Sequence, residues 1–485
     1  MVKKTKRKGP KGTTKRPRKA SRLRQGGLIA LALLLVVVGF LTYKRWHAWF
    51  GNSPEPSYYT LDSIDRITLV PGLRFDSERS ITWRCGETPR SAFLEYGLAG
   101  QDTIIEERRW LPARAEVVQT RSGKSCYYQA KLYGLQAGRT YRYRLHTGGE
   151  HSPRYDFVIP NDSLRSEFIY IGDVQDPSGA MSDSLLPGLR TLVPRIDFLA
   201  AGGDQIEGPT SAYWDIWYKA LGDWSPSLTI LAATGNHEYL KRGFLRDLDP
   251  RWMASYAYPK NGPEGFEGRS YYVDFPLFRY IVMDSNGIRS PLDVTRHRSW
   301  LSQVLRTSQQ PWQIVMFHHA IYNVREGRMH PVMRYAFRGI LEEDGADLVL
   351  QGHDHAYSRI STRNEAGEPT APMYVVSSFS PKLYRNGFDD IHDRLGSGLQ
   401  LYQHIVVTSD SLHYRSHQYD GRLYDDVVLH RPQGQASIRI EDRAGGIPEE
   451  FRFSSFASDE KGQRKATKYR QAVAEYLAKK KQNKQ

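Results

Sequence analysis

The chain has 485 residues, of which 40% are hydrophobic and 12% aromatic, enough for one large domain and a smaller one. Its formal net charge of +15 is carried by the two ends: residues 1–25 hold 12 Lys/Arg and no acid, and residues 461–485 hold nine Lys/Arg and one Glu. Residues 26–460 hold 47 basic and 52 acidic side chains, a net charge of −5. This argues against a nucleic-acid-binding core, which would carry its positive patch on the fold itself.

Residues 26–43 read GGLIALALLLVVVGFLTY, 18 residues without a charge, which is just long enough to span a bilayer as a helix. The alternative is a cleaved signal peptide, but the preceding basic region is long and no small-x-small cleavage site follows. The basic excess before the segment predicts a cytoplasmic N-terminus. We therefore expect a basic cytoplasmic tail over 1–25, a single-pass membrane anchor over 26–43, a linker over 44–62, and a periplasmic or extracellular body.

Residues 63–160 consist of short alternating runs separated by turn signals. In TYRYRL at 140–145, apolar and aromatic residues occupy one face and arginines the other, which is typical of a half-buried strand. About 100 residues of this kind predict an all-β sandwich. The segment LYGLQAGRTYRYRL resembles the late strands of fibronectin type III modules, with Trp83 as the expected core tryptophan.

The chain has only two cysteines, Cys85 and Cys126, and both lie in this β-rich segment. In an oxidising compartment they could form a disulfide. Two unpaired structural thiols are an alternative that the sequence leaves open.

From residue 165 to residue 425, apolar strands alternate with helical or mixed stretches, and several strands end in a glycine and a polar residue. This pattern indicates an α/β domain whose site lies at the strand ends. The polar residues at five successive strand ends are Asp173, Asp204, Asn236, His318, His353 and His355. A single such residue has ordinary structural explanations, but five strand ends in order do not, because buried carboxylates and imidazoles are costly without a partner.

The chemistry of these side chains points to a metal site. Carboxylate, amide and imidazole ligands suit Zn, Mn or Fe and argue against a thiolate site. In an extended segment, His353 and His355 would point to the same side because they are two residues apart.

The order of the motifs, with ATGNHE at 233–238 and GHDHAY at 352–357 as the most specific, resembles the calcineurin-like metallophosphoesterase superfamily. Within it, the chain resembles the purple acid phosphatase-like branch, which also carries an N-terminal fibronectin-like domain. The resemblance implies a four-layer αββα sandwich, preceded here by the fibronectin III-like sandwich and the transmembrane helix, with a dinuclear metal centre at the shared edge of the two sheets.

The resemblance also implies a ligand set. Asp173 and His355 would hold the first metal, Asp204 would bridge, and Asn236, His318 and His353 would hold the second. His318 is preferred to His319 because Val315-x-x-His318 fits the family motif.

Three further residues are implied near the substrate. His237 follows Asn236 and corresponds to a histidine near the leaving group, so it is the candidate general acid or transition-state hydrogen-bond donor. His330 and Arg334 fall in a region that contacts substrate in related enzymes, although surface positions would explain both equally.

Two positions depart from the family pattern. Gln175 stands where many members have a histidine, and Glu207 stands where purple acid phosphatases have a tyrosine. Each is a candidate weak metal ligand or a residue just outside the ligands. Without the tyrosine, the purple ferric–phenolate colour should be absent.

The sequence therefore predicts a membrane-anchored, exported hydrolase of phosphate esters with two metal ions, Fe, Mn or Zn, and phosphomonoesters as the favoured substrates. The alternatives are a nucleotide or lipid-headgroup phosphodiesterase and a non-catalytic cell-surface binding protein on the same fold. No nucleic-acid partner is predicted, and the oligomeric state is left open.

The last segment, 426–485, is expected to be an irregular extension with a basic tail. Within it, Tyr469, Val473 and Tyr476 recur at helical spacing among basic residues. A solvated, frayed helix and a helix that touches anionic lipid or glycan are both compatible with this pattern.

Overall fold

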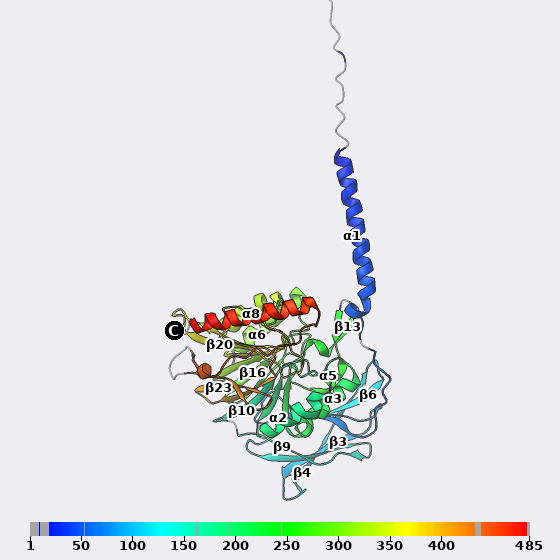
Figure 1. Ribbon diagram of the computed structural model, residues 1–485. Helices are drawn as coiled ribbons and strands as arrows, with labels where there is room; N and C mark the ends of the chain where they lie inside the picture. Colours follow the sequence, from blue (N-terminus) through cyan, green and yellow to red (C-terminus); the bar gives the residue numbers. More distant parts are fainter. Residues whose placement is uncertain are drawn as a thin grey trace, which may run out of the picture. The chain divides into compact units, whose positions relative to one another are not determined.

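The computed structural model describes residues 9, 19–52, 54–161, 163–193, 195–243, 245–431 and 438–482. Most of the predicted cytoplasmic tail lies outside these residues. The first element is the helix α1 (Lys19–Phe50), shown in blue in Figure 1. Its stretch Gly27–Trp46 is long and apolar enough to cross a membrane, a property that a signal sequence shares. The helix is longer than the predicted anchor, because residues 19–25 and 44–50 are helical as well. The linker predicted to begin at residue 44 therefore begins only after Phe50.

The segment that follows is a β-sandwich of two antiparallel sheets. One sheet has the order β1-β2-β6-β5 and the other β4-β3-β7-β8, with β9 also paired to β7. The strands are β1 (Asp65–Pro71), β2 (Arg79–Arg84), β3 (Ala92–Ala99), β4 (Ile105–Pro112), β5 (Arg114–Gln119), β6 (Lys124–Leu132), β7 (Thr140–Thr147), β8 (Glu150–His151) and β9 (Tyr155–Val158).

The sandwich core has the expected tryptophan at its centre. Trp83 is fully buried, stacks on Tyr128 with 5.6 Å between ring centroids, and donates from Nε1 to Thr147 Oγ1 at 2.9 Å. Cys85 and Cys126 are buried free thiols, and burial raises the pKa of the Cys85 thiol to about 11. In this structure the two cysteines are packing residues.

The second domain contains two seven-stranded sheets. Their orders are β12-β11-β10-β22-β23-β24-β25 and β15-β16-β17-β18-β20-β19-β21. The strands are β10 (Ser166–Ile171), β11 (Phe198–Ala201), β12 (Thr229–Ala232), β15 (Tyr271–Asp274), β16 (Phe278–Val282), β17 (Trp312–Met316), β18 (Leu348–Gln351), β19 (Tyr357–Arg363), β20 (Pro369–Val376), β21 (Arg394–Gly396), β22 (Leu401–Val407), β23 (Ser411–Gln418), β24 (Leu423–His430) and β25 (Arg439–Asp442). The short strands β13 (Tyr239–Arg242) and β14 (Leu245–Leu248) lie outside these sheets.

Helices pack against the sheets because alternate strand residues face opposite sides. Val315 of β17 and Val349 of β18 form one apolar cluster with Leu301 and Phe337 from helices, whereas Ile314 and Leu348 belong to the large core that contains residues of both sheets. The helices are η1 (Met181–Leu185), α2 (Leu186–Leu192), α3 (Ser211–Leu221), α4 (Trp224–Ser227), η2 (Asn236–Glu238), α5 (Pro250–Ser255), α6 (Pro291–Arg306), α7 (Pro331–Glu343), η3 (Ala444–Gly446) and α8 (Glu460–Gln482).

The C-terminal extension is more regular than expected. The predicted domain boundary at residue 425 falls inside β24, and β25 adds another strand to the same sheet. The tail forms α8, red in Figure 1. Its tyrosines are packed rather than solvated: Tyr469 and Tyr476 lie 5.8 and 5.3 Å from the ring of Phe388, because positions seven apart share one face of a helix.

Candidate metal centre

The predicted site residues follow the carboxyl ends of neighbouring parallel strands. In one sheet β10, β11 and β12 are parallel neighbours, and the segments after them carry Asp173, Asp204 and Asn236. In the other sheet β17 and β18 are parallel neighbours, followed by His318 and by the segment that contains His353 and His355. Parallel neighbours end at the same edge of a sheet, so the fold brings these residues together.

Four of the candidate ligands have a left-handed backbone. The φ angles are +48° at Asp173, +52° at Asp204, +73° at His353 and +46° at His355. Such values are uncommon for residues other than glycine and cluster at functional sites. They also correct the extended geometry expected for residues 352–355: β18 ends at Gln351, and the histidines converge through a tight loop.

Asp204, His318 and His353 form the tightest group. His318 Nε2 lies 3.2 Å from Asp204 Oδ2 and 3.1 Å from His353 Nδ1, and all three side chains are buried. His318 Nδ1 donates to the Gly202 carbonyl oxygen at 3.0 Å, which turns Nε2 toward the group. Although burial disfavours its charge, the carboxylate of Asp204 raises the pKa of His318 to about 10. The site therefore favours a positive charge between its carboxylates.

His355 and Asp173 form the second part of the cluster. His355 Nδ1 donates to the Lys382 carbonyl oxygen, and its Nε2 lies 3.6 Å from Asp173 Oδ1. The backbone N–H of His353 donates to both carboxylate oxygens of Asp173, at 2.9 and 2.7 Å. Burial lowers the pKa of His355 to about 3, so its imidazole is neutral, the form that binds metals. Carbonyl-anchored histidines of this kind are typical of metal sites.

Gln175 joins the two parts. Its Nε2 lies 3.2 Å from Asp204 Oδ2 and 3.2 Å from His355 Nε2. Its Oε1 and the Nε2 of His353 are both buried, and neither has a hydrogen-bond partner among the described residues. Buried polar atoms without a partner are costly, and a cation beside His353 Nε2 would supply the missing partner. Asp204, His318 and His353 form a group that could hold a metal ion.

Asn236 and His237 lie at the rim. Asn236 begins the turn η2 and is exposed. The backbone N–H of His237 donates to Asp204 Oδ1 at 2.8 Å. The His237 ring is half-buried; its Nδ1 lies 2.6 Å from the Glu207 carbonyl oxygen and its Nε2 3.9 Å from Asp204 Oδ2. Nε2 therefore points to the edge of the cluster.

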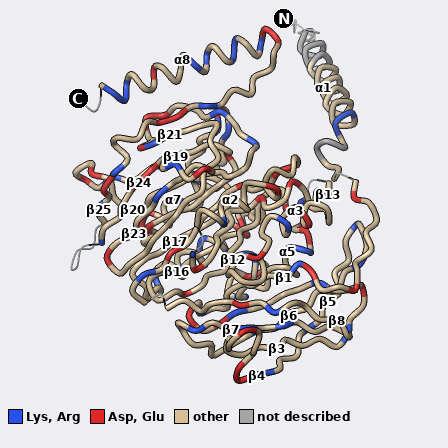
Figure 2. The backbone as a smooth tube through the Cα atoms, turned by 60° about the horizontal axis from the view of Figure 1, so that its bottom comes forward, with Lys and Arg blue, Asp and Glu red and all other residues tan. Residues whose placement is uncertain are grey.

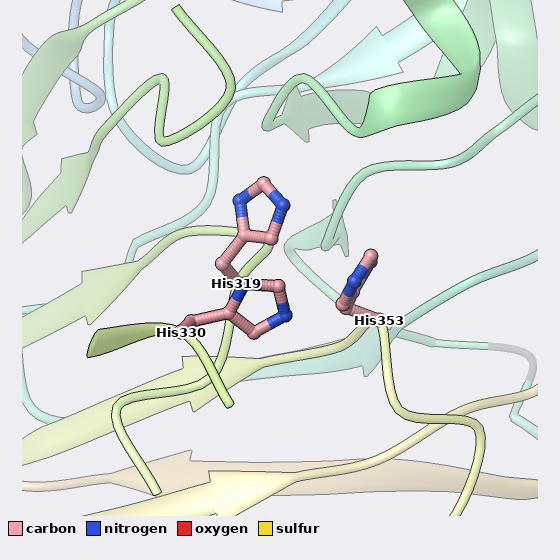
Figure 3. Close-up of side chains that lie close together, drawn as sticks. All are labelled: His319, His330 and His353. Atoms are coloured by element: carbon pink, nitrogen blue, oxygen red, sulfur yellow. The ribbon is translucent and has the colours of Figure 1, made fainter. Parts of the chain in front are cut away.

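Figure 3 shows a group of imidazoles beside the cluster, formed by His319, His330 and His353. The ring of His319 lies 4.6 Å from those of His330 and His353, and His330 lies 4.8 Å from His353. His319 Nδ1 is paired with Ser285 Oγ at 3.0 Å. His319, the less favoured candidate, thus lies at the site, and His330 lies there as expected.

The side chains of Glu207 and Arg334 have partners outside the metal cluster. Glu207 Oε1 lies 3.4 Å from Lys382 Nζ, so this carboxylate is paired with a lysine. Arg334 is exposed and its guanidinium lies 4.9 Å from the Tyr322 ring centroid. The backbone N–H of Arg334 donates to the His330 carbonyl oxygen at 3.3 Å, but no contact recorded for its guanidinium within the described residues involves the cluster.

Two buried acids that the sequence analysis did not single out support the ligand loops. Glu238 accepts hydrogen bonds from the backbone N–H groups of Gly235 at 2.6 Å and Asp204 at 3.0 Å. Asp354 accepts from the backbone of Val324 at 2.8 Å. In the sequence, Glu238 follows His237 and Asp354 lies between His353 and His355. This proximity to the histidine motifs is the signal that could have identified both acids. Gly235 permits this packing, because a Cβ there would lie 2.1 Å from the backbone nitrogen of Asp204.

Comparisons with known proteins agree with this architecture. Residues 167–357 match the family described as calcineurin-like phosphoesterase, and residues 64–159 match the purple acid phosphatase N-terminal domain. Purple acid phosphatase 22 of Arabidopsis thaliana is 23% identical over 53% of this chain and 58% of its own length. Purple acid phosphatase 18 of the same plant is 24% identical over 62% of this chain and 68% of its own length. The chain thus spans about three fifths of the length of these two relatives.

Solved structures share the fold. The purple acid phosphatase PPD1 from yellow lupin (Lupinus luteus) seeds has a TM-score of 0.62 at 18% identity, over 77% of this chain and 75% of that one. PhoD has a TM-score of 0.57 at 14% identity, over 88% of this chain and 100% of that one. Residues 167–357 thus form a calcineurin-like phosphoesterase domain, and residues 64–159 before it match a purple acid phosphatase N-terminal domain.

Proposed function

We propose that this protein hydrolyses phosphate esters, with phosphomonoesters as the favoured substrates, through two metal ions. The observation that carries the proposal is the buried cluster of two carboxylates and three imidazoles, in which His353 Nε2 lacks a protein partner among the described residues. A purely structural role would leave the buried His353 Nε2 without a partner, which is costly.

The proposed ligand assignment follows the two parts of the cluster. Asp173 and His355 would hold one ion, Asn236, His318 and His353 would hold the other, and Asp204 would be shared by both. Ions bound there would supply Lewis acidity and neutralise the charge of a phosphoryl group. Iron, manganese and zinc all suit these ligands.

His237 is the proposed general acid. The Glu207 carbonyl accepts a hydrogen bond from its Nδ1–H, so the protonated ring would present Nε2–H at the rim and give that proton to the leaving-group oxygen, which leaves the ring neutral. His330 is proposed to contact the phosphoryl oxygens, supported by its ring contact with His353. Gln175 is proposed to lie beside the first ion.

Further proposals concern location and the first domain. The apolar stretch of α1 supports a single-pass anchor with a cytoplasmic N-terminus and an exported body. The two antiparallel sheets of the sandwich support a fibronectin type III-like fold for residues 63–160. Protease protection of the body in sealed membranes, with resistance of the protein to alkaline extraction, would test the anchor. A freely extractable, shortened chain would show cleavage instead.

The enzymatic proposal is tested on the full-length chain with Mn, Zn or Fe added. Metal content is measured together with hydrolysis of p-nitrophenyl phosphate, a monoester, and bis(p-nitrophenyl) phosphate, a diester. The variant Asp204→Asn should lose metal and at least about a hundredfold in kcat/KM. Asp420→Asn, an exposed partner of Arg422, is the matched control and should retain both. No hydrolysis with any metal would overturn the proposal.

A further inference from the structure

A pocket of about 390 Å³ lies beside the metal centre, at the start of α8. Four stretches of the chain build it: Arg325 and Glu326, Tyr384 and Arg385, the segment 453–457 with two phenylalanines, and the segment 459–465 at the start of the helix. The first two stretches are joined by the backbone bond from Glu326 N–H to Arg385 O at 3.2 Å. The pocket therefore has a defined wall on each side.

The pocket is tied directly to the ligand loop. Asp354 accepts a hydrogen bond from the Arg325 backbone at 3.1 Å, and the His355 carbonyl accepts one from the Tyr384 backbone at 3.1 Å. The ring of Tyr384 lies 4.8 Å from that of His355, and the Arg325 guanidinium lies 3.6 Å from the Tyr384 ring centroid. One aromatic ring thus separates a proposed metal ligand from the first cation of the pocket.

The pocket is positively charged. Four cationic side chains line it against two acidic ones, and the acids are Glu326 and Asp459. Glu326 is paired with Arg385, and Asp459 Oδ1 accepts from the Gly462 backbone N–H at 2.6 Å.

The other three cations, Arg325, Lys461 and Lys465, form no ion pair with any described residue of the chain. Figure 2 shows such basic positions along α8. Cations that gather around a hollow without a counter-charge attract an anion, and hydrogen bonds between charged groups are the strong ones.

We propose that this pocket binds a second anionic group of the substrate, so that the preferred substrates are phosphate monoesters that carry another phosphate at the far end. The inference rests on the proposed function and names its substrate class. Tyr384, Arg385 and α8 lie beyond the residues that match the phosphoesterase family, whereas Arg325 and Glu326 lie within them.

The test compares alkanediol bisphosphates of increasing chain length with alkyl monophosphates of the same length, using the full-length, metal-loaded protein. The ratio of kcat/KM for bisphosphate over monophosphate should pass through a maximum at one spacer length, because the two sites are a fixed distance apart. Arg325→Met and Lys461→Met should each lower that maximum about tenfold, the effect of one lost charge-assisted contact. Lys468→Met, on the same helix but outside this pocket, should keep the wild-type ratio.

A ratio without a length optimum, or one that the two pocket variants leave within twofold of the wild type, would overturn the inference. Inorganic phosphate should lower the bisphosphate preference without changing monophosphate hydrolysis, because it competes for the pocket; a bisphosphate preference that inorganic phosphate leaves unchanged would contradict the inference.

A calorimetric arm separates this result from failure of the enzymatic proposal. Butane-1,4-diyl bisphosphonate, which cannot be hydrolysed, should bind about tenfold more weakly to Lys461→Met than to the wild type or Lys468→Met. This difference in affinity is expected even if the protein hydrolyses no ester. Equal affinities of the three proteins would contradict the proposal that the pocket binds an anionic group.

Discussion

Glu238 anchors the backbone of Asp204: its Oε2 accepts the Asp204 N–H at 3.0 Å, and its Oε1 accepts the next N–H, that of Gln205, at 2.7 Å. The left-handed backbone of Asp204 is costly by itself. A buried carboxylate that binds two successive N–H groups offsets this cost and aims the Asp204 side chain into the cluster. The proposed bridging ligand is thus positioned by a residue from a different strand end.

The variant Glu238→Gln should therefore weaken both stability and metal binding. One amide N–H₂ would face backbone N–H donors, so we expect a loss of about 1–3 kcal/mol in the free energy of unfolding and about 10–100-fold weaker metal affinity. Urea unfolding and metal titration measure the two effects. Glu264→Gln, on an exposed acid paired with Arg296, should change neither; unchanged metal affinity in Glu238→Gln would contradict the positioning role.

Gln175 supplies a second prediction, because it lies 3.2 Å from both Asp204 Oδ2 and His355 Nε2. Gln175→His should tighten binding of the first metal about tenfold or more, since imidazole is the stronger ligand for Zn and Fe. Gln175→Ala should weaken it if the amide oxygen takes part. Competition with a chelator measures both variants, and equal affinities for all three proteins would remove Gln175 from the site.

Glu207 leads to a spectroscopic prediction. With its carboxylate beside Lys382 and no phenol at this position, the iron-loaded protein should show no phenolate-to-iron charge-transfer band. Glu207→Tyr should introduce one if the position faces the metal. A band in the wild type would refute the prediction; its loss in Tyr384→Phe would then trace it to Tyr384, whose ring contacts His355.

The gathering of Asp173, Asp204 and the histidines could be predicted from the sequence because motifs at successive strand ends must meet at one edge of a sheet. The left-handed loop at His353 could not, since its backbone is held by tertiary bonds such as that from His353 N–H to Asp173. The same applies to α8. The helical spacing of its tyrosines is visible in the sequence, but the residue they pack against, Phe388, lies some 80 residues earlier in the chain and leaves no local signal. The approach of His319 to His330 could not be predicted either, because it depends on how two separate loops pack.

Tyr469 tests whether α8 is an integral part of the fold. Its hydroxyl is bonded to Ser397 Oγ and, at 2.6 Å, to Asn386 Oδ1, and its side chain is buried. Tyr469→Phe keeps the ring but leaves Asn386 without this donor, so unfolding should require about 1–2 kcal/mol less free energy. Urea unfolding monitors the change. Gln471→Ala, on the exposed face of the helix, should stay within about 0.5 kcal/mol of the wild type, and equal losses in both variants would mean that the hydroxyl contributes nothing specific.

His392 gives a prediction for pH. Its ring is buried and its Nδ1 lies 2.7 Å from Ser358 Oγ, and burial lowers the pKa of His392 from 6.5 to about 4. Between these values the unfolded chain binds a proton that the folded chain does not, so the free energy of unfolding falls as the pH drops from about 6.5 toward 4. The contribution of this residue approaches about 1.4 kcal/mol per pH unit. His392→Gln cannot take up the proton and should show a correspondingly shallower loss in urea unfolding across this range. Because both proteins share every other titrating group, the difference in slope isolates His392, and parallel curves would show that the ring accepts a proton without leaving its buried position.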